Sequence, residues 1–499
     1  QYVKGNSDMK KLLSNARFYT MISENDYYDS VLIENGNILK MFKTKPELTG
    51  IEELDLNSAF VYPGFIDTHT HSFEGGLYNL GTYLGDISTL KDLFAKLSFS
   101  QPISNKIFAY GFDENKIKEK RFPTASELDR IFPDKPVFIR RVDGHSSAIN
   151  TKAAAQIDWQ QPLPAPFTGH LNRSWNGRAS NWFHRNLDED SILNAYFTAA
   201  EIAIKKGHTT VHTMIGDAHS DPKHFRLIKN NLRRFPLEYI LYPQITDCQV
   251  AKDLGASRIG GCILADGSFG SHTAALKEPY NDQPESHGTL YRTDEFWEKF
   301  ILAAHKENLQ IAVHCIGDRA IEQILKCYEL AQHQYPKDLR HEIIHNELTS
   351  DETLDRLKKA RISAVMQPMF DRLWAGPGGL YETRLGKERT SRTNRLASIY
   401  QRNILLTGGS DWYITEINAL KGIDAAVRIH NPAERLTPFQ AVKIYTSNAA
   451  ALSFDEDKIG TLQNGRQADF VCLKEDIFQS NNISNIAITQ VIKKGKLLL

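Results

Sequence analysis

Two histidines close an apolar segment of the chain, Phe60-Val61-Tyr62-Pro63-Gly64-Phe65-Ile66-Asp67-Thr68-His69-Thr70-His71. The pair Pro63-Gly64 interrupts the apolar run, which then resumes for a few residues. Because successive side chains of a β-strand alternate between its two faces, His69 and His71 are expected to share one face. Two imidazoles on one face at a strand end form half of a metal site. Paired surface histidines also occur without a metal, so the remaining ligands have to be found elsewhere in the chain.

The segment Pro63–His71 resembles the first-strand signature of the amidohydrolase superfamily. This resemblance implies an α/β fold in which a metal-dependent hydrolase is built on a (β/α)8 barrel. It also implies a set of ligands: two histidines on strand one, a bridging residue on strand four, one histidine each on strands five and six, and an aspartate on strand eight. One or two divalent metal ions, with Zn²⁺ expected, would be the cofactor.

Three further polar residues follow apolar runs in the order that this ligand set requires. His314 ends Gln310–His314, His345 ends Glu342–His345, and Asp411 follows Ile404–Ser410. Barrel enzymes carry their chemistry just past the ends of their strands. Each residue alone indicates little, but all three behind a His-x-His pair together predict a metal centre of His69, His71, His314, His345 and Asp411.

The resemblance extends over roughly residues 15 to 497 and narrows to the subgroup called amidohydrolase family 3. This subgroup includes N-substituted formamide deformylases and YtcJ-like proteins. The motifs that carry the likeness are Gly111–Glu114, Asp143–Ser146, Asn150, Ala265–Ser271, Gly317–Ala320, Gln367-Pro368 and Gly409–Asp411.

The chain departs from this family at two positions. Members commonly have a lysine four residues before the Asp-Gly-Ser motif, whereas this chain has Cys262. A cysteine thiolate is a good zinc ligand, so Cys262 is a candidate sixth ligand; the alternative is a small buried apolar residue. With a thiolate in the set, we expect one tightly held zinc ion. The second departure is Ile344 before His345, where an acid is usual, and this changes the surroundings of the ligand.

Both ends of the chain have the pattern of short strands and turns. The pair Asn35-Gly36 lies between two apolar runs and predicts a hairpin. Near the C-terminus, Asn464-Gly465 and Ala468–Leu473 have the same character. The resemblance implies that residues 1–59 and 455–499 build one small β-sandwich beside a barrel of residues 60–454. Periodicity alone does not show whether segments so far apart pair.

Between these ends, short runs rich in β-branched residues alternate with helical patterns, as in parallel β-α units. Nine runs are strand candidates: Phe60–Ile66, Lys106–Tyr110, Val137–Val142, Thr209–Thr213, Cys262–Ala265, Ile311–Cys315, Glu342–His345, Ser363–Gln367 and Ile404–Thr407. A (β/α)8 barrel needs only eight strands, and an insertion is expected around residues 107–190. One of the second and third runs, Lys106–Tyr110 or Val137–Val142, would then lie in that insertion.

Composition narrows the class of partner. The 60 basic residues equal the 60 acidic residues in number, so no net charge attracts nucleic acid or an anionic membrane. No segment approaches the ~20 apolar residues of a membrane span. We therefore expect a small-molecule substrate, no nucleic acid, no membrane, and a homodimer. The five cysteines lack close pairing and favour a reducing compartment such as the cytoplasm, although the start at Gln1 leaves a removed signal peptide open.

The predicted reaction is hydrolysis of an amide-type C–N bond by metal-activated water. The metal lowers the pKa of bound water toward ~7. Asp411 is expected to accept the water proton and to deliver it to the leaving nitrogen, as general base and then general acid. Polar residues near other predicted strand ends are candidates for substrate contact, or alternatively for structural roles: His145, Asn150, His212 and Asp266.

Two other functions have to be considered. The sequence His341-Glu342-Ile343-Ile344-His345 fits the H-E-x-x-H pattern of zinc proteases, which works only on a helix. The two consecutive isoleucines favour a strand, on which the two histidines would lie about 13 Å apart at ~3.3 Å per residue. A non-catalytic or regulatory protein of the same fold is the other alternative, but the chain keeps the predicted ligands.

Overall fold

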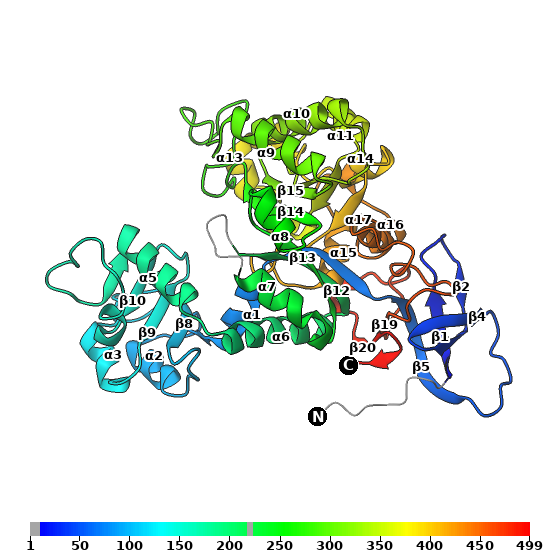
Figure 1. Cartoon of the computed structure of the whole chain (residues 1–499), viewed down its shortest axis with the longest axis horizontal. Coiled ribbons are helices and arrows are strands. Elements are labelled where there is room, and N and C mark those ends of the chain that lie inside the picture. The colour runs from blue at the N-terminus through cyan, green and yellow to red at the C-terminus, as the bar shows by residue number, and fades with distance from the viewer. Residues whose placement is uncertain (1–9, 217–222) are drawn as a thin grey trace. The chain divides into compact units, whose positions relative to one another are not determined.

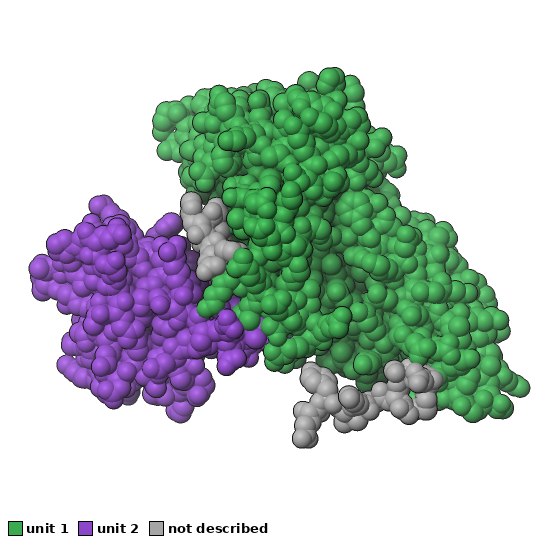
Figure 2. Space-filling view, in the orientation of Figure 1, with its two compact units in different colours: residues 1–71, 200–499 green, residues 72–199 purple. Residues whose placement is uncertain are grey.

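The structure is a computed structural model, and it describes residues 10–216 and 223–499. The fold is α/β, and the chain divides into two compact units, residues 1–71 with 200–499 and residues 72–199 (Figure 2). Each unit has its own sheets and its own apolar core. No helix in the described part of the chain is long and apolar enough to cross a membrane.

The first unit contains an eight-stranded sheet made from both ends of the chain. Its order is β21-β20-β19-β5-β1-β3-β4, and β2 pairs with β1. Val471 on β19 lies opposite Tyr62 on β5, so strands more than 400 positions apart are direct neighbours. The strands are β1 (Lys11–Tyr19), β2 (Tyr27–Tyr28), β3 (Ser30–Glu34), β4 (Asn37–Phe42), β5 (Glu52–Pro63), β19 (Phe470–Leu473), β20 (Ile488–Lys493) and β21 (Lys496–Leu497).

The pair Pro63-Gly64 carries the chain from this sheet directly into a second set of strands. Strand β5 ends at Pro63, and β6 (Phe65–Thr70) begins two residues later, with Gly64 alone between them. A Cβ atom on Gly64 would overlap the side chain of Thr209 on β12 (His208–Ile215), so glycine is what allows the two strands to approach. The run predicted as one strand, Phe60–Ile66, is therefore the end of one strand and the start of another.

Eight parallel strands of the first unit form two further sheets, each called an arc below; β12 to β15 are labelled in Figure 1. The three-stranded arc has the order β13-β12-β6, and the five-stranded arc has the order β14-β15-β16-β17-β18. The strands not yet introduced are β13 (Glu238–Pro243), β14 (Arg258–Leu264), β15 (Gln310–Cys315), β16 (Glu342–His345), β17 (Ser363–Met366) and β18 (Leu406–Gly408).

Helices alternate with these strands, as parallel pairing requires. Several begin at a capping side chain; for example, the hydroxyl oxygen of Ser350 accepts a hydrogen bond from the Thr353 amide. The helices after residue 188 are α6 (Glu189–Lys205), α7 (Lys223–Asn231), α8 (Cys248–Asp253), α9 (Asp294–Lys306), α10 (Asp318–Gln334), α11 (Asp351–Lys359), α12 (Pro368–Trp374), α13 (Leu380–Thr390), α14 (Leu396–Gln401), α15 (Ala419–Val427), α16 (Pro438–Ile444) and α17 (Ser447–Leu452).

The second unit has a five-stranded sheet in the order β11-β10-β9-β8-β7 over a core that includes Leu93, Ile107 and Val137. It spans residues 72–199 and so extends beyond the predicted insertion on both sides. Its elements before α6 are α1 (Ser72–Leu80), β7 (Thr82–Tyr83), α2 (Leu90–Leu97), β8 (Ile107–Phe112), α3 (Ala125–Ile131), β9 (Val137–Arg141), β10 (Ser146–Ile149), α4 (Thr151–Ala154), β11 (His170–Asn172) and α5 (Arg173–Arg185).

The expectation that either Lys106–Tyr110 or Val137–Val142 lies among the parallel strands of the first unit is wrong. Both runs lie in the second unit, as β8 and β9. The strand missed from the sequence is β13, whose residues Glu-Tyr-Ile-Leu-Tyr-Pro are half-buried at three of six positions and end in proline. A buried parallel strand ordinarily gives a long continuous apolar run, whereas that of β13 is only the four residues Tyr239–Tyr242 between Glu238 and Pro243.

The segment from His341 to His345, whose histidines are four positions apart, does not form a metal-binding helix. Residues 342–345 form strand β16, and both ring nitrogens of His341 are used by the fold. The Ile311 amide donates to His341 Nδ1 (3.0 Å), so the His341 proton lies on Nε2 and is donated to His305 Nδ1 (2.8 Å). The other ring nitrogen of His305 donates to the Tyr335 carbonyl (2.6 Å).

This chain of hydrogen bonds requires both rings to be neutral. Burial lowers the pKa of His305, and it lowers the pKa of His341 well below the ordinary value. In the unfolded chain both rings titrate near ~6.5. As the pH falls below that value, the two histidines bind protons in the unfolded chain but stay neutral in the folded chain. The free energy of unfolding therefore decreases.

We therefore expect the free energy of unfolding to fall below pH 6.5 by up to about 1.4 kcal/mol per pH unit for each of the two histidines. Urea unfolding from pH 7.5 to 5 measures this slope. His341→Gln should flatten it, whereas the matched control His333→Gln, at an exposed position of α10, should not. Equal slopes in the wild type and His341→Gln would show that the pair does not titrate on unfolding.

Candidate metal centre

The six predicted ligands come together at the carboxyl ends of the parallel strands of the first unit. His69 and His71 lie at the end of β6, His314 and His345 lie on β15 and β16, and Asp411 follows β18. In parallel α/β structures this edge of the strands is where functional side chains gather. Cys262 belongs to β14, the strand next to β15.

One group of ligand atoms surrounds the Asp411 carboxylate. Oδ1 of Asp411 lies 3.3 Å from Nε2 of His69 and 3.3 Å from Nε2 of His71. The chain reaches this geometry because the Asp411 amide donates to the His69 carbonyl (2.9 Å), which joins the segment after β18 to the end of β6. Candidate ligand atoms of these three residues all lie within 4.8 Å of one another.

A second group surrounds Cys262 and shares His69 with the first. Candidate ligand atoms of Cys262, His69 and His345 lie within 4.8 Å of one another. The sulfur of Cys262 also lies 3.9 Å from Nδ1 of His314. The ring centroids of His314 and His345 lie 4.5 Å apart, and the two ring planes form an angle of 75°, which is an edge-to-face contact. The two groups together form one continuous set of nitrogen, sulfur and oxygen atoms.

A bulge in β14 aims Cys262 at these rings. Gly260 and Gly261 have φ angles of 91° and 67°, and the register with β15 shifts between Ile259 and Ile263. A Cβ on Gly260 would overlap the Ala312 carbonyl oxygen, so that position has room only for glycine. Bulges of this kind redirect a side chain at the rim of a sheet.

Hydrogen bonds to two histidines fix which ring nitrogen remains free. Nε2 of His314 donates to the Gly267 carbonyl (3.1 Å), and this leaves the Nδ1 lone pair on the side of Cys262. Nδ1 of His345 donates to Oε1 of Gln367 (2.7 Å), and this leaves the Nε2 lone pair free. Such partners orient metal-binding histidines.

Two of the predicted ligands occupy unusual backbone conformations. His345 has φ 70° and Asp411 has φ 54°, both in the left-handed region that non-glycine residues rarely adopt. Residues held in this region cost of order 1–3 kcal/mol each and gather at functional sites. The surrounding hydrogen bonds therefore maintain these two side-chain positions against a local conformational preference.

The ligands also shift one another's pKa values. Burial opposes charge on His69, but Asp411 and Cys262 raise the pKa of His69 to about 9. Burial likewise opposes ionisation of Asp411, yet His69 and His71 hold the pKa of its carboxyl well below its usual range. Burial raises the pKa of the Cys262 thiol, and the neighbouring histidines outweigh that effect, so the pKa is well below the ordinary value. An anionic carboxylate and thiolate are the forms that bind metals.

Asp67, to which the sequence analysis gave no role, ties the two halves of the first ligand group together. Its buried carboxylate accepts hydrogen bonds from the amide of His69 (3.1 Å) and from the amide of Ser410 (3.0 Å). Burial raises the pKa of Asp67 to about 6, although these hydrogen bonds oppose the rise. Asp67 stands inside the histidine motif, but its partner Ser410 follows more than 300 positions later, so only the folded chain reveals the contact.

Two of the predicted substrate residues lie in the first unit and are engaged by the fold. The carboxylate of Asp266 accepts hydrogen bonds from the amides of Ala275 (2.8 Å), Ile316 (3.0 Å) and Gly317 (2.8 Å), and it lies 3.8 Å from Nε2 of His314. His212 is buried on β12, with its Nδ1 3.4 Å from the hydroxyl of Tyr242. Its contact with substrate stays a prediction.

The other two predicted substrate residues belong to the second unit. His145 is exposed, in the turn between β9 and β10. Asn150 is buried and structural in its contacts: its side-chain oxygen accepts from the amides of Val137 and Ala153, and its side-chain nitrogen donates to the carbonyls of Phe132 and Lys135.

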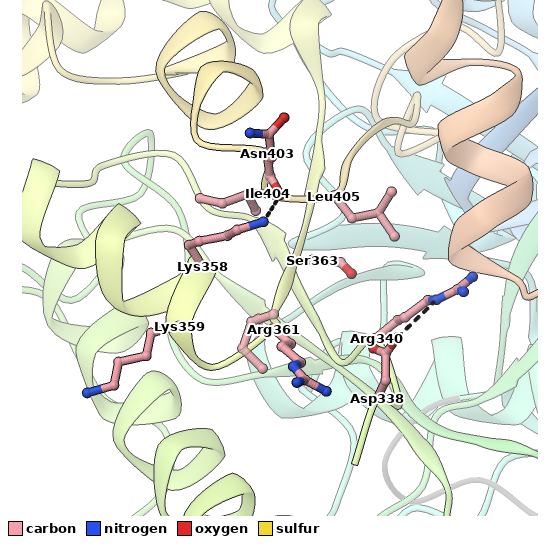
Figure 3. A pocket seen from close by; sticks show the side chains of 10 residues that line it. Asp338, Arg340, Lys358, Lys359, Arg361, Ser363, Asn403, Ile404 and Leu405 are labelled. Atoms are coloured by element: carbon pink, nitrogen blue, oxygen red, sulfur yellow. Dashed lines mark hydrogen bonds and ion pairs between the residues drawn. The ribbon is translucent and has the colours of Figure 1, made fainter. Parts of the chain in front are cut away.

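A separate pocket of about 400 Å³ lies at the opposite, amino-terminal ends of β16, β17 and β18 (Figure 3). Two of its four basic lining residues are engaged: Arg340 pairs with Glu456, and Lys358 donates to the Asn403 carbonyl (2.6 Å). None of the predicted site residues lines this pocket.

Comparison with known proteins identifies the family. The model of the amidohydrolase family matches residues 52–499, so this chain belongs to the amidohydrolase family, as its motifs predicted. The Bacillus subtilis (strain 168) protein YtcJ is 29% identical over 94% of this chain and 95% of its own. The N-substituted formamide deformylase of Arthrobacter pascens is 22% identical over 93% of each chain.

A solved structure agrees with this assignment. The crystal structure of an uncharacterized metal-dependent hydrolase from Pyrococcus furiosus superimposes with a TM-score of 0.82 and 26% sequence identity, covering 94% of this chain and 100% of that chain. The family and these similarities support a hydrolase that uses a divalent metal.

The residues at the site fit such a metal. Both ring nitrogens of His69 and Oδ1 of Asp411 are buried without a hydrogen-bond partner among the described residues. Leaving a buried polar atom unpaired costs about 1–3 kcal/mol, and a bound cation would remove that cost for the atoms it touches. Imidazole, carboxylate and thiolate are the ligand types that Zn²⁺ and similar ions select.

We expect His69→Ala to remove most of the bound divalent metal, because His69 belongs to both ligand groups. Metal per chain, measured by inductively coupled plasma mass spectrometry after dialysis, checks this. His341→Gln serves as the control and should keep the wild-type metal content. Loss of metal in His341→Gln, with full content in His69→Ala, would instead favour an H-E-x-x-H site.

Proposed function

We propose that this protein hydrolyses an amide-type C–N bond of a small molecule, of the N-acyl or N-formyl amine class, with a metal-activated water. The observation that carries the proposal is the single set of six ligand side chains at the carboxyl ends of the parallel strands, in which buried atoms of His69 and Asp411 have no hydrogen-bond partner among the described residues. The name of the Arthrobacter pascens relative, a formamide deformylase, motivates the substrate class.

The proposal includes a closed (β/α)8 barrel made of the two parallel arcs. Hydrogen bonds across both gaps support closure. The Gly260 amide donates to the Ile245 carbonyl (3.2 Å) between β13 and β14, and the Asp411 amide donates to the His69 carbonyl at the other gap. The sheet of the chain ends would form a small sandwich around its core of Val31, Ile38 and Ile492, among others.

In the proposed mechanism, the metal ligands are His69, His71, Cys262, His314, His345 and Asp411. When bound, a divalent metal supplies Lewis acidity that lowers the pKa of water toward ~7 and polarises a substrate carbonyl. The chain supplies orientation: Gly267 and Gln367 fix the tautomers of His314 and His345, and Asp67 fixes the distance between β6 and the segment that carries Asp411.

Asp411 is the proposed proton carrier. Its carboxylate is ionised, lies against His69 and His71, and is not sealed from solvent, because the side chain of His71 is 18% exposed and that of Asp411 is 8% exposed. In this position the carboxylate accepts the proton of the attacking water and returns it to the leaving nitrogen. The products are a carboxylic acid and an amine, with all atoms of one water consumed.

The direct test is a panel of N-formyl, N-acyl and related amides assayed with the metal-free protein and again after addition of Zn²⁺. Hydrolysis that depends on added metal supports the proposal. A protein that binds metal tightly and folds normally, but cleaves no member of the panel or of a matched ester panel, would favour the non-catalytic alternative.

We expect Asp411→Asn to lower turnover by ~10²–10⁴, because the amide keeps the size of the side chain but cannot accept the proton. Steady-state kinetics on the best substrate of the panel measure the change. Circular dichroism on the same sample shows whether the fold is retained. A folded Asp411→Asn protein with near-normal turnover would mean that another group moves the proton.

Cys262 decides how many ions the site holds. A carboxylated lysine at this position would offer two oxygens and could bridge two metals, whereas a single sulfur is softer and favours zinc over magnesium or manganese. The sulfur already lies 3.9 Å from Nδ1 of His314 and near His69 and His345. We therefore assign Cys262 as a ligand of one tightly held zinc ion, with any second ion bound weakly.

X-ray absorption at the zinc edge tests this assignment, because sulfur scatters differently from nitrogen and oxygen. A sulfur neighbour in the wild type that is absent in Cys262→Ser is the expected result. A shell of nitrogen and oxygen alone in the wild type would mean that Cys262 packs as a thiol among the apolar residues around it, such as Met214 and Ile344.

A further inference from the structure

Gln367 follows β17 and precedes helix α12, and its side chain does not serve that helix. It occupies the position before the first turn, where a side chain commonly caps the helix, but it makes no capping hydrogen bond. Instead, Oε1 accepts the Nδ1–H of His345 at 2.7 Å, between two buried side chains. The side-chain nitrogen of Gln367 is buried and has no hydrogen-bond partner in the described part of the chain.

This contact decides where the His345 proton lies. A glutamine side-chain oxygen can only accept, so the ring carries its hydrogen on Nδ1 and keeps its lone pair on Nε2. A neutral imidazole offers one lone pair. Without an acceptor at Nδ1, the proton could move to Nε2 and occupy the nitrogen that a metal needs.

The same helical turn also fixes the plane of the His345 ring. The ring of Phe370 stacks on His345 with centroids 5.4 Å apart and an angle of 14°. The Phe370 amide donates to the Gln367 carbonyl (2.9 Å), which ties the two side chains to one rigid turn. One turn of α12 therefore restrains both the rotation and the tautomer of His345.

We propose that Gln367 is the positioning residue of the metal centre, setting the tautomer of His345 through its side-chain oxygen, with Phe370 holding the ring plane. The inference rests on the proposed function only in taking His345 as a ligand. It also explains why a buried polar side chain is kept at this place despite one unpaired nitrogen, which itself costs about 1–3 kcal/mol.

Two substitutions separate the oxygen from the bulk of the side chain. Gln367→Met keeps the length and removes the acceptor, and it should weaken zinc binding by about 10–100-fold, the range for losing such a partner. Gln367→Glu keeps an oxygen and should stay within about threefold of the wild type or bind more tightly. Gln323→Met, at a buried glutamine of α10 that donates to the Arg292 carbonyl, is the control for general loss of packing. Competition with a chromophoric zinc chelator measures all four proteins.

A second measurement does not depend on metal or on activity. Nitrogen NMR of the metal-free protein labelled with ¹⁵N-histidine identifies the protonated nitrogen of His345, whose signals are assigned by their loss in His345→Gln. The wild type and Gln367→Glu should carry the proton on Nδ1, and Gln367→Met should show a shift toward Nε2.

The outcomes distinguish this inference from the proposed function. If the wild type binds no divalent metal, the proposed function fails, and the NMR result still decides the role of Gln367. If the wild type binds zinc and Gln367→Met binds it equally well with an unchanged tautomer, the inference is overturned. Equal weakening in Gln367→Met and Gln323→Met would likewise assign the effect to packing and overturn it.

Discussion

The buried carboxylate of Asp67 is the contact on which the metal centre depends. It accepts hydrogen bonds from the amides of His69 and Ser410, and so fixes the distance between the first and the last of the parallel strands. The hydroxyl of Thr68 joins the same two strands, at 3.0 Å from the hydroxyl of Thr407 and 3.0 Å from the Gly408 carbonyl. Burying an ionisable group without hydrogen bonds costs free energy, so arrangements of the two strands that lack these bonds to Asp67 are disfavoured.

Around this contact, the ligands are oriented before any ion binds. His314 and His345 each donate a ring hydrogen to an oxygen of the chain, Cys262 is aimed by a glycine bulge, and Asp411 is held in a left-handed backbone conformation. Preorganisation of this kind lowers the entropy that binding must overcome. The groups that orient the predicted ligands are glycine residues, backbone carbonyls and the side chain of one glutamine.

The sequence predicted the candidate ligands better than it predicted the residues that orient them. His69, His71, His314, His345 and Asp411 were identifiable because they stand, near the ends of apolar runs, in the order of the amidohydrolase ligand set, and the structure brings these side chains together. Asp67 and Gln367 could not be given roles, because their partners are distant in sequence. Asn150 shows the converse: a polar residue near a strand end was a candidate for substrate contact, yet its amide is used by neighbouring backbone groups. Strand β13 was missed because its apolar run, Tyr239–Tyr242, is short and is followed at once by Pro243.

The junction at Gly64 couples the two sheets of the first unit thermodynamically. Strand β5 pairs with β19 from the far end of the chain, and β6, which leads to the predicted ligands His69 and His71, begins two residues after Pro63. With no linker to absorb a displacement, fraying of the terminal sheet would be transmitted to His69. By linkage, an ion that binds only the folded site stabilises the pairing of the chain ends by RT ln(1 + [M]/Kd), where [M] is the free ion concentration. The two termini are thus part of the site's cooperative unit, although neither contributes a ligand.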